Sequence, residues 1–114
     1  MDTIERGDLF VNTARVTVPP ENRIELLQTI WSLLIPIKSE KGCLMYRFYE
    51  EAGEENSFML IGEWETQELC QIHLRSDNYA VLHGSIMVLG NRSDVDFKML
   101  SRVASIETAT QERV

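Results

Sequence analysis

Apolar residues recur with two different periods along this chain of 114 residues. Apolar residues at every second position are typical of strands, whereas apolar residues three or four positions apart are typical of helices. The leader 1–7 and the polar tail 105–114 are expected to be loose, so a single domain is predicted with its core at about 9–103. The pattern predicts four strands, over residues 9–18, 43–50, 58–64 and 95–103, and three helices, over residues 20–35, 67–74 and 77–89.

Capping and breaking residues mark the ends of the predicted helices. Pro20 and Glu21 favour a helix start, and Pro36 is expected to disrupt or end that helix. Thr66 and Ser76 are placed to cap the second and third helices. In the first helix, a stripe at helical spacing is expected to face the core, which makes Trp31 a core residue; it comprises Ile24, Leu27, Trp31 and Leu34.

The order β-α-β-β-α-α-β predicts an α+β fold, a ferredoxin-like antiparallel sheet with its helices on one face. Alternation along the strands assigns each side chain to one of two faces. The face expected to contact the helices carries Leu44, Tyr46, Phe48, Phe58, Leu60, Gly62 and Trp64. The opposite face carries Met45, Arg47, Tyr49, Met59, Ile61, Glu63, Leu9, Val11, Thr13 and Arg15.

The opposite face is too apolar to be left in water. An open antiparallel sheet usually presents a polar second face to solvent, and a monomer seldom exposes a large apolar patch. We therefore expect a homodimer formed through the sheet face that bears Met45, Met59 and Ile61. Because buried charges are usually paired, Glu63 is expected to pair with Arg47 or Arg15 on that face.

Charge and hydropathy exclude some classes of partner. The chain has 18 acidic and 11 basic residues and a formal net charge of −7, whereas nucleic-acid binding needs clustered Lys and Arg. No apolar run approaches the roughly 20 residues of a membrane span. The N-terminus has no basic region followed by an apolar core, so no signal peptide is expected. We expect a cytoplasmic protein with neither a nucleic-acid nor a membrane partner.

Three short motifs suggest a family. In chain order they are Gly42-Cys43-Leu44-Met45-Tyr46, Glu63-Trp64 and His73-Leu74-Arg75-Ser76. With their spacing, these motifs resemble the antibiotic biosynthesis monooxygenase family, and the similarity runs over about residues 9–103. The resemblance implies a dimeric α/β barrel, in which two ferredoxin-like subunits pack sheet to sheet. Known members include cofactor-independent oxygenases of anthrones and quinols, haem-degrading enzymes, and an isomerase of a phosphorylated signalling sugar.

The resemblance also implies a site, because the family's pocket lies between the helices and the sheet. It implies a floor of Asn12, Tyr46 and Trp64, with His73 and His83 as candidates for the roof. A cofactor-free oxygenase needs a base near neutral pH, an apolar pocket and a donor for the oxyanion. Histidine has an unperturbed pKa that suits the base, so His73 is the first catalytic candidate and His83 the second.

Four further side chains are candidates for binding a small aromatic substrate. Asn12 and Tyr46 could orient its oxygen atoms, while Trp64 and Phe48 could stack on a flat ring. Each candidate also has a purely structural reading, in which Trp64 is a core residue and His73 packs against the sheet. Asn12 is polar at an inward position and therefore needs a hydrogen-bond partner.

Three functions stay open at this point. The first is a cofactor-independent monooxygenase of an aromatic or quinol-type substrate, and the second is a non-catalytic dimeric domain for ligand binding or interaction. The third and weakest is haem binding or degradation, because His83 matches the iron ligand of the haem-degrading relatives. Those relatives carry a tryptophan where this chain has His73, and anthrone-oxidising relatives carry an asparagine where it has Leu60. No cofactor and no metal site are expected, since the two histidines form no zinc pattern.

Overall fold

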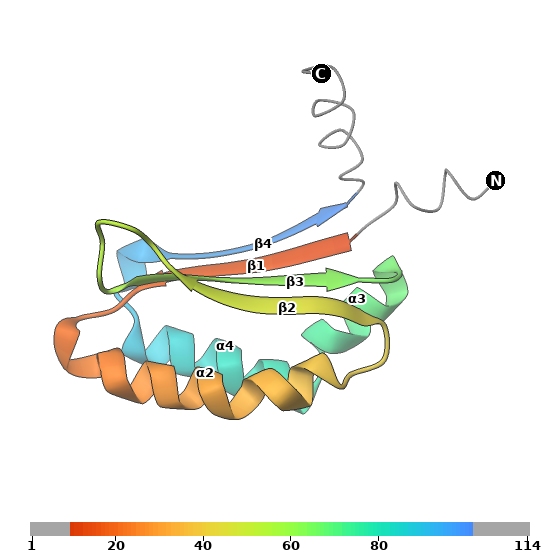
Figure 1. The fold of residues 1–114 in the computed structure, drawn as a ribbon, viewed down its shortest axis with the longest axis horizontal. Helices are drawn as coiled ribbons and strands as arrows, with labels where there is room; N and C mark the ends of the chain where they lie inside the picture. The colour runs from red at the N-terminus through yellow and green to blue at the C-terminus, as the bar shows by residue number, and fades with distance from the viewer. Residues whose placement is uncertain (1–9, 102–114) are drawn as a thin grey trace, which may run out of the picture.

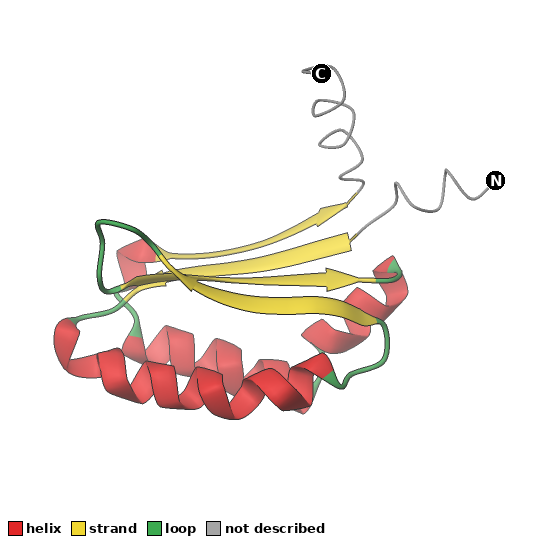
Figure 2. Ribbon diagram, viewed as in Figure 1, coloured by secondary structure: helices red, strands yellow, loops and turns green. Residues whose placement is uncertain are grey.

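The computed structural model describes residues 10–101, which form one sheet covered on one face by helices. Figures 1 and 2 show α2 and α4 side by side beneath the sheet, with the short α3 under one end. The antiparallel strands lie in the order β2-β3-β1-β4, which confirms the predicted ferredoxin-like α+β fold. The elements are β1 (Phe10–Thr17), α2 (Arg23–Lys38), β2 (Cys43–Glu50), β3 (Ser57–Trp64), α3 (Gln67–Leu74), α4 (Asp77–Leu89) and β4 (Val95–Ser101).

The boundaries agree with the sequence prediction to within a few residues. The 3-10 turns Pro20–Asn22 and Arg92–Asp94 precede α2 and β4, and the predicted caps Thr66 and Ser76 both accept hydrogen bonds at their helix starts. The predicted leader and tail, Leu9 and residues 102–103 lie outside the described residues. None of the helices between residues 10 and 101 is long and apolar enough to cross a lipid bilayer.

The strand register brings distant parts of the chain into rows across the sheet. Tyr46 on β2 lies opposite Gly62 on β3, and Gly62 lies opposite Asn12 on β1. Phe10 is paired with Trp64 at the same end of the sheet. Since side chains in one row point to the same face, Tyr46, Gly62 and Asn12 all face the helix layer. The register therefore brings together all three predicted floor residues, namely Asn12, Tyr46 and Trp64.

The core lies between this face and the helices, but α2 turns a different stripe inward than predicted. Trp31 is 68% exposed and Ile24 is exposed as well, so their assignment to the core was wrong. A shift of one residue rotates a helix position by about 100°, and α2 has apolar residues on both of the stripes concerned. Spacing alone could not choose between them. The buried stripe is Leu26, Ile30, Leu33 and Ile37.

Pro36 does not end α2, which continues to Lys38. A proline removes one backbone donor and crowds the preceding turn, which is most disruptive in a helix interior. Here it lies in the last turn, and Ser39 N–H still donates to the Ile35 carbonyl at 3.1 Å. The helix therefore tolerates Pro36, and the predicted end at residue 35 was too early.

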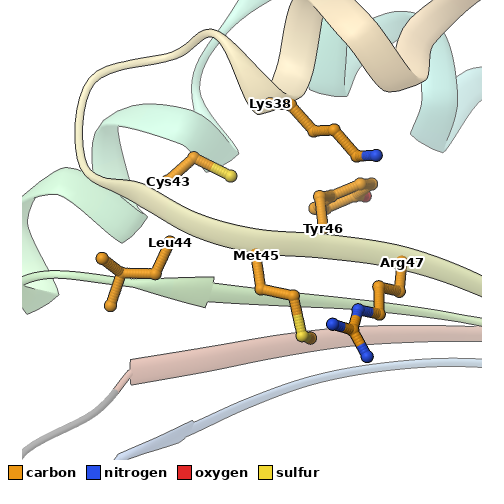
Figure 3. A pocket seen from close by; sticks show the side chains of 6 residues that line it. All are labelled: Lys38, Cys43, Leu44, Met45, Tyr46 and Arg47. Carbon is orange, nitrogen blue, oxygen red and sulfur yellow. The ribbon is translucent and has the colours of Figure 1, made fainter.

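A bulge at the start of β2 corrects the assignment of Leu44. Cys43 pairs with Trp64 and Met45 with Glu63, so Leu44 is an extra residue without a partner on β3. It is 53% exposed instead of facing the helices. Alternation resumes after it: Figure 3 shows Met45 and Arg47 on the side of β2 opposite to Tyr46.

No described element covers the other face of the sheet, which Figure 2 shows bare. Met59 and Ile61 are half-buried there by their neighbours alone. Arg15 pairs with Glu51 at 2.7 Å, and within residues 10–101 no ion pair joins Glu63 to Arg15 or Arg47. The expected pairing of Glu63 is therefore not made among residues 10–101.

Two glycines allow a direct test of a close contact beneath α3. Gly42 and Gly53 both have φ of 85°, a conformation that costs other residues about 1–2 kcal/mol. A Cβ on Gly42 would lie 2.5 Å from Leu69 Cδ1 and 2.8 Å from Leu69 Cβ, whereas a Cβ on Gly53 would meet open space. We expect Gly42→Ala to lower the free energy of unfolding by at least about 1 kcal/mol more than Gly53→Ala in urea titrations. Equal losses in the two variants would contradict this contact.

Candidate active site

His73 occupies the centre of a buried aromatic cluster at one end of the sheet. It lies near the end of α3, and its imidazole is only 1% exposed. The ring stacks on the Trp64 indole with centroids 4.4 Å apart and an interplanar angle of 24°. Tyr46 and Tyr79 meet it edge-on, at centroid distances of 5.8 and 5.2 Å. Because α3 is capped by Thr66 directly after β3 ends, the chain places His73 back over the last residue of that strand.

Asn12 fixes the indole on which His73 lies. The Trp64 Nε1–H donates to Asn12 Oδ1 at 2.7 Å, which satisfies both buried groups. Gly62 makes room for this bond, since a Cβ there would lie 2.6 Å from Asn12 Oδ1 and 2.9 Å from Trp64 Nε1. A glycine inside a strand often marks such a close approach. The hydrogen-bond partner that the sequence demanded for Asn12 is thus Trp64.

Glu40 belongs to this site, although sequence reasoning did not select it. It lies in the turn between α2 and β2, and its Oε1 is 2.8 Å from His73 Nδ1. Its Oε2 accepts from Asn78 Nδ2 at 2.8 Å and more weakly from Ser76 Oγ at 3.5 Å. The side chain is 18% exposed. No local motif marks this glutamate, because its partner His73 is 33 residues away in the sequence.

Two polar atoms of the cluster are buried and have no hydrogen-bond partner among residues 10–101. They are His73 Nε2 and the Tyr46 hydroxyl. Burial lowers the pKa of His73, and the hydrogen bond and charge of Glu40 oppose that shift. Burial also raises the pKa of Tyr46 far above its usual range. At neutral pH the cluster therefore holds a neutral imidazole and a protonated phenol.

His83 and Phe48 lie outside the buried cluster. His83 is exposed on α4, where its ring stacks on Phe97 at 4.5 Å and is tilted against Tyr79 at 5.9 Å. Phe48 stacks on Phe58 at 5.3 Å. Of the six candidates, the structure thus brings Asn12, Tyr46, Trp64 and His73 together, and it places the other two elsewhere.

The cluster is closed, with surface hollows on either side of it. Asn12, Tyr46, Trp64 and His73 are all buried, so no open pocket separates the roof from the floor. One hollow of about 420 Å³ reaches His73 from the surface; it is lined by Glu40, Lys41, Leu69, Ile72, His73, Ser76, Asp77 and Asn78. Another, of about 270 Å³, reaches Tyr46 at the edge of β2, as Figure 3 shows; it is lined by Lys38, Cys43, Leu44, Met45, Tyr46 and Arg47. Within residues 10–101, no group of three or more His, Cys, Asp or Glu side chains could hold a metal ion.

One protein family matches most of this chain. A family model described as antibiotic biosynthesis monooxygenase matches residues 9–84, which is more than half of the chain. The chain belongs to the antibiotic biosynthesis monooxygenase family. The matched region includes β1, β2, β3 and α3, and therefore every residue of the buried cluster.

Two relatives of this family member come from Bacillus subtilis and Synechocystis. "Putative monooxygenase YcnE" of Bacillus subtilis is 32% identical over 65 residues, which cover 57% of this chain and 68% of YcnE. "Uncharacterized protein sll1783" of Synechocystis is 29% identical over 69 residues, which cover 60% of this chain. The match spans only 47% of the length of sll1783. Family membership and the name of YcnE support a monooxygenase-like function in general terms.

Solved structures support the fold. A conserved protein from Methanosarcina mazei superposes with a TM-score of 0.77 over 86% of this chain and 96% of its own, at 19% sequence identity. Rv0793 from Mycobacterium tuberculosis superposes with a TM-score of 0.73 over 81% of this chain and 92% of its own, at 23% identity. These likenesses show that the family member has the ferredoxin-like fold of its neighbours.

The buried imidazole should make stability depend on pH. The pKa of His73 is lowered in the folded protein relative to its ordinary value of about 6.5. The unfolded chain therefore binds the proton more readily, and stability is lost as the pH falls from above 6.5 toward the folded-state pKa. We expect urea titrations at pH 7.5 and 5.5 to show this loss, and His73→Gln to reduce it. An equal pH dependence in both proteins would contradict a buried, neutral His73.

Proposed function

We propose that this protein is a cofactor-independent monooxygenase of a small aromatic or quinol-type substrate, with His73 as its base. The observation that carries the proposal is the unpartnered Nε2 of a buried, neutral His73, whose ring meets Tyr46 edge-on; the Tyr46 hydroxyl is also unpartnered. A buried polar atom without a partner costs about 1–3 kcal/mol. A substrate hydroxyl and its oxygen would satisfy both atoms at once.

The proposed reaction needs only dioxygen besides the organic substrate. His73 Nε2 removes the proton of a phenolic hydroxyl, and the phenolate passes one electron to dioxygen to give an aryloxyl radical and superoxide. These combine at a ring carbon to give a peroxide, which takes up a proton from the imidazolium. Loss of the C–H proton with cleavage of the O–O bond leaves a carbonyl and releases water. Phenol and dioxygen are thereby converted into quinone and water.

The side chains of the cluster suit different parts of this chemistry. Tyr46 stays protonated because burial raises its pKa, so its hydroxyl can donate to the substrate oxyanion. Trp64 shields one face of His73 from water, and Asn12 holds the indole in place. We assign Asn12 and Trp64 to supporting the base, since the Oδ1 of Asn12 is already engaged. Because Nε2 is buried, α3 is expected to move away from the sheet to admit the substrate.

The proposal includes no haem, because it rests on the buried cluster around His73. His83, the residue matched to the iron ligand of haem-degrading relatives, lies outside that cluster and stacks on Phe97.

Oxygen uptake with a panel of quinols and anthrones tests the proposed function. We expect consumption of one dioxygen per substrate for at least one compound, and a loss of about 10²-fold or more in kcat for His73→Gln. His83→Gln is the matched comparison, because it makes the same change outside the buried cluster. A larger loss in His83→Gln would move the base to His83. No uptake with any compound would favour the non-catalytic ligand-binding or interaction domain.

We also propose that the protein forms a homodimer through the bare face of its sheet. Half-buried Met45, Met59 and Ile61 lie on that face together with Val11, and the helices cover only the other side. Burial of apolar area contributes roughly 25 cal/mol per Å², so a second copy would gain most by covering this face. Two subunits packed sheet to sheet would form the α/β barrel.

A charge on this face should separate the subunits. We expect Ile61→Asp to convert the dimer into a monomer in analytical ultracentrifugation at micromolar concentration, because an unpaired buried charge is strongly unfavourable. Ile35→Asp is the control, since Ile35 is 75% exposed on the helix layer and should leave the dimer intact. A wild-type protein that is monomeric under these conditions would rule the interface out.

A further inference from the structure

The carboxylate of Glu40 touches the one nitrogen of His73 that the proposed chemistry does not use. Its Oε1 lies 2.8 Å from Nδ1, whereas Nε2 has no partner within residues 10–101. An ionised carboxylate can only accept hydrogen bonds. A neutral imidazole has one N–H, and the hydrogen bond made by one nitrogen decides which tautomer is present.

We propose that Glu40 is a positioning residue that holds the His73 proton on Nδ1 and thereby presents the Nε2 lone pair to the substrate. This inference rests on the proposed function of His73 as the base. Glu40 touches neither the substrate nor the reacting atoms in this arrangement, and it acts only through the imidazole. In this role Glu40 would make the buried His73 a base that accepts a proton at Nε2 and not at Nδ1.

The surroundings of Glu40 show that its carboxylate is held in place. Asn78 donates to Oε2 at 2.8 Å from the first turn of α4, and Ser76, the cap of that helix, lies 3.5 Å from the same oxygen. One carboxylate thus joins the turn after α2, the end of α3 and the start of α4. Because Oε2 is held by these two groups, the carboxylate resists following a rotation of the imidazole, which stabilises the orientation of the ring.

No other group packed against His73 can take over this role. The ionisable groups around the ring are Glu40 from the turn before β2, Tyr46 from β2 and Tyr79 from α4. Burial raises the pKa of both tyrosines, so they stay neutral near pH 7. Trp64 contributes only its ring face. Glu40 is therefore the one carboxylate in contact with His73 among the described residues.

Long-range ¹H–¹⁵N spectra of the full chain with labelled histidine report the tautomer directly, without a substrate. A comparison with His83→Gln assigns the two histidines. In the wild-type protein at pH 7.5 we expect the His73 proton on Nδ1. In Glu40→Ala we expect the ratio of the Nδ1–H to the Nε2–H form to fall by about tenfold or more, as the loss of a charge-assisted hydrogen bond implies. Glu40→Gln retains an acceptor oxygen and should keep most of the Nδ1–H form.

Asn78→Ala is the matched control for a merely structural effect. It removes a hydrogen bond from the same carboxylate but leaves the acceptor at Nδ1, so the tautomer ratio should stay within about twofold of wild type. An unchanged ratio in Glu40→Ala, or an equal change in Asn78→Ala, would overturn the inference. If Glu40→Ala does not fold, the wild-type spectrum still decides, because a proton on Nε2 there is incompatible with it.

The proposed function and the role of Glu40 fail in different experiments. Oxygen uptake that depends on His73, with a tautomer that does not depend on Glu40, would leave the base in place and remove the positioning role. A tautomer set by Glu40 in a protein that oxidises no compound of the panel would leave the dyad in place and remove the proposed reaction. When turnover is found, Glu40→Ala should lower kcat by about tenfold or more with little change in KM.

Discussion

The indole of Trp64 is the support on which the rest of the site depends. One edge is tied to β1 through Asn12, and one face carries the imidazole of α3. The hydrogen bond needs the absence of a side chain at Gly62, because a Cβ there would lie 2.6 Å from Asn12 Oδ1 and 2.9 Å from Trp64 Nε1. Gly62 does not have a positive φ, so its role here depends on packing alone. The hydrogen bond from the Trp64 indole to Asn12 also explains why an asparagine is stable at a buried position of β1.

The periodicity of the sequence predicted the fold because each strand and helix has its own repeat and clear end signals. It could not choose between two apolar stripes on α2, and so it placed Trp31 in the core. It also could not foresee a bulge, which moves Leu44 out of the alternation without leaving a sign in the apolar pattern. Where the register was regular, as at Tyr46, the predicted face is confirmed.

The candidate site was predicted in part. Asn12, Tyr46 and Trp64 were selected by a family resemblance together with strand parity, and the register brings them together. His73 was selected by the resemblance, and α3 places it against Trp64. Glu40 was missed because its contact with His73 depends on how the turn after α2 packs against α3, which no local pattern encodes. His83 was selected by the same resemblance and for its residue type, and only the structure shows that its side chain is exposed on α4, outside the buried cluster.

The bulge on β2 also bears on how this sheet meets other chains. β2 is an outer strand of the sheet, and an outer strand exposes a row of backbone groups that can template the growth of fibrils. The unpaired Leu44 interrupts that row, and the cationic side chains of Lys38 and Arg47 flank the same segment (Figure 3). A further strand arriving here finds a bulged edge with two cationic side chains beside it. These features discourage the addition of a fifth strand at β2 and aggregation through this edge.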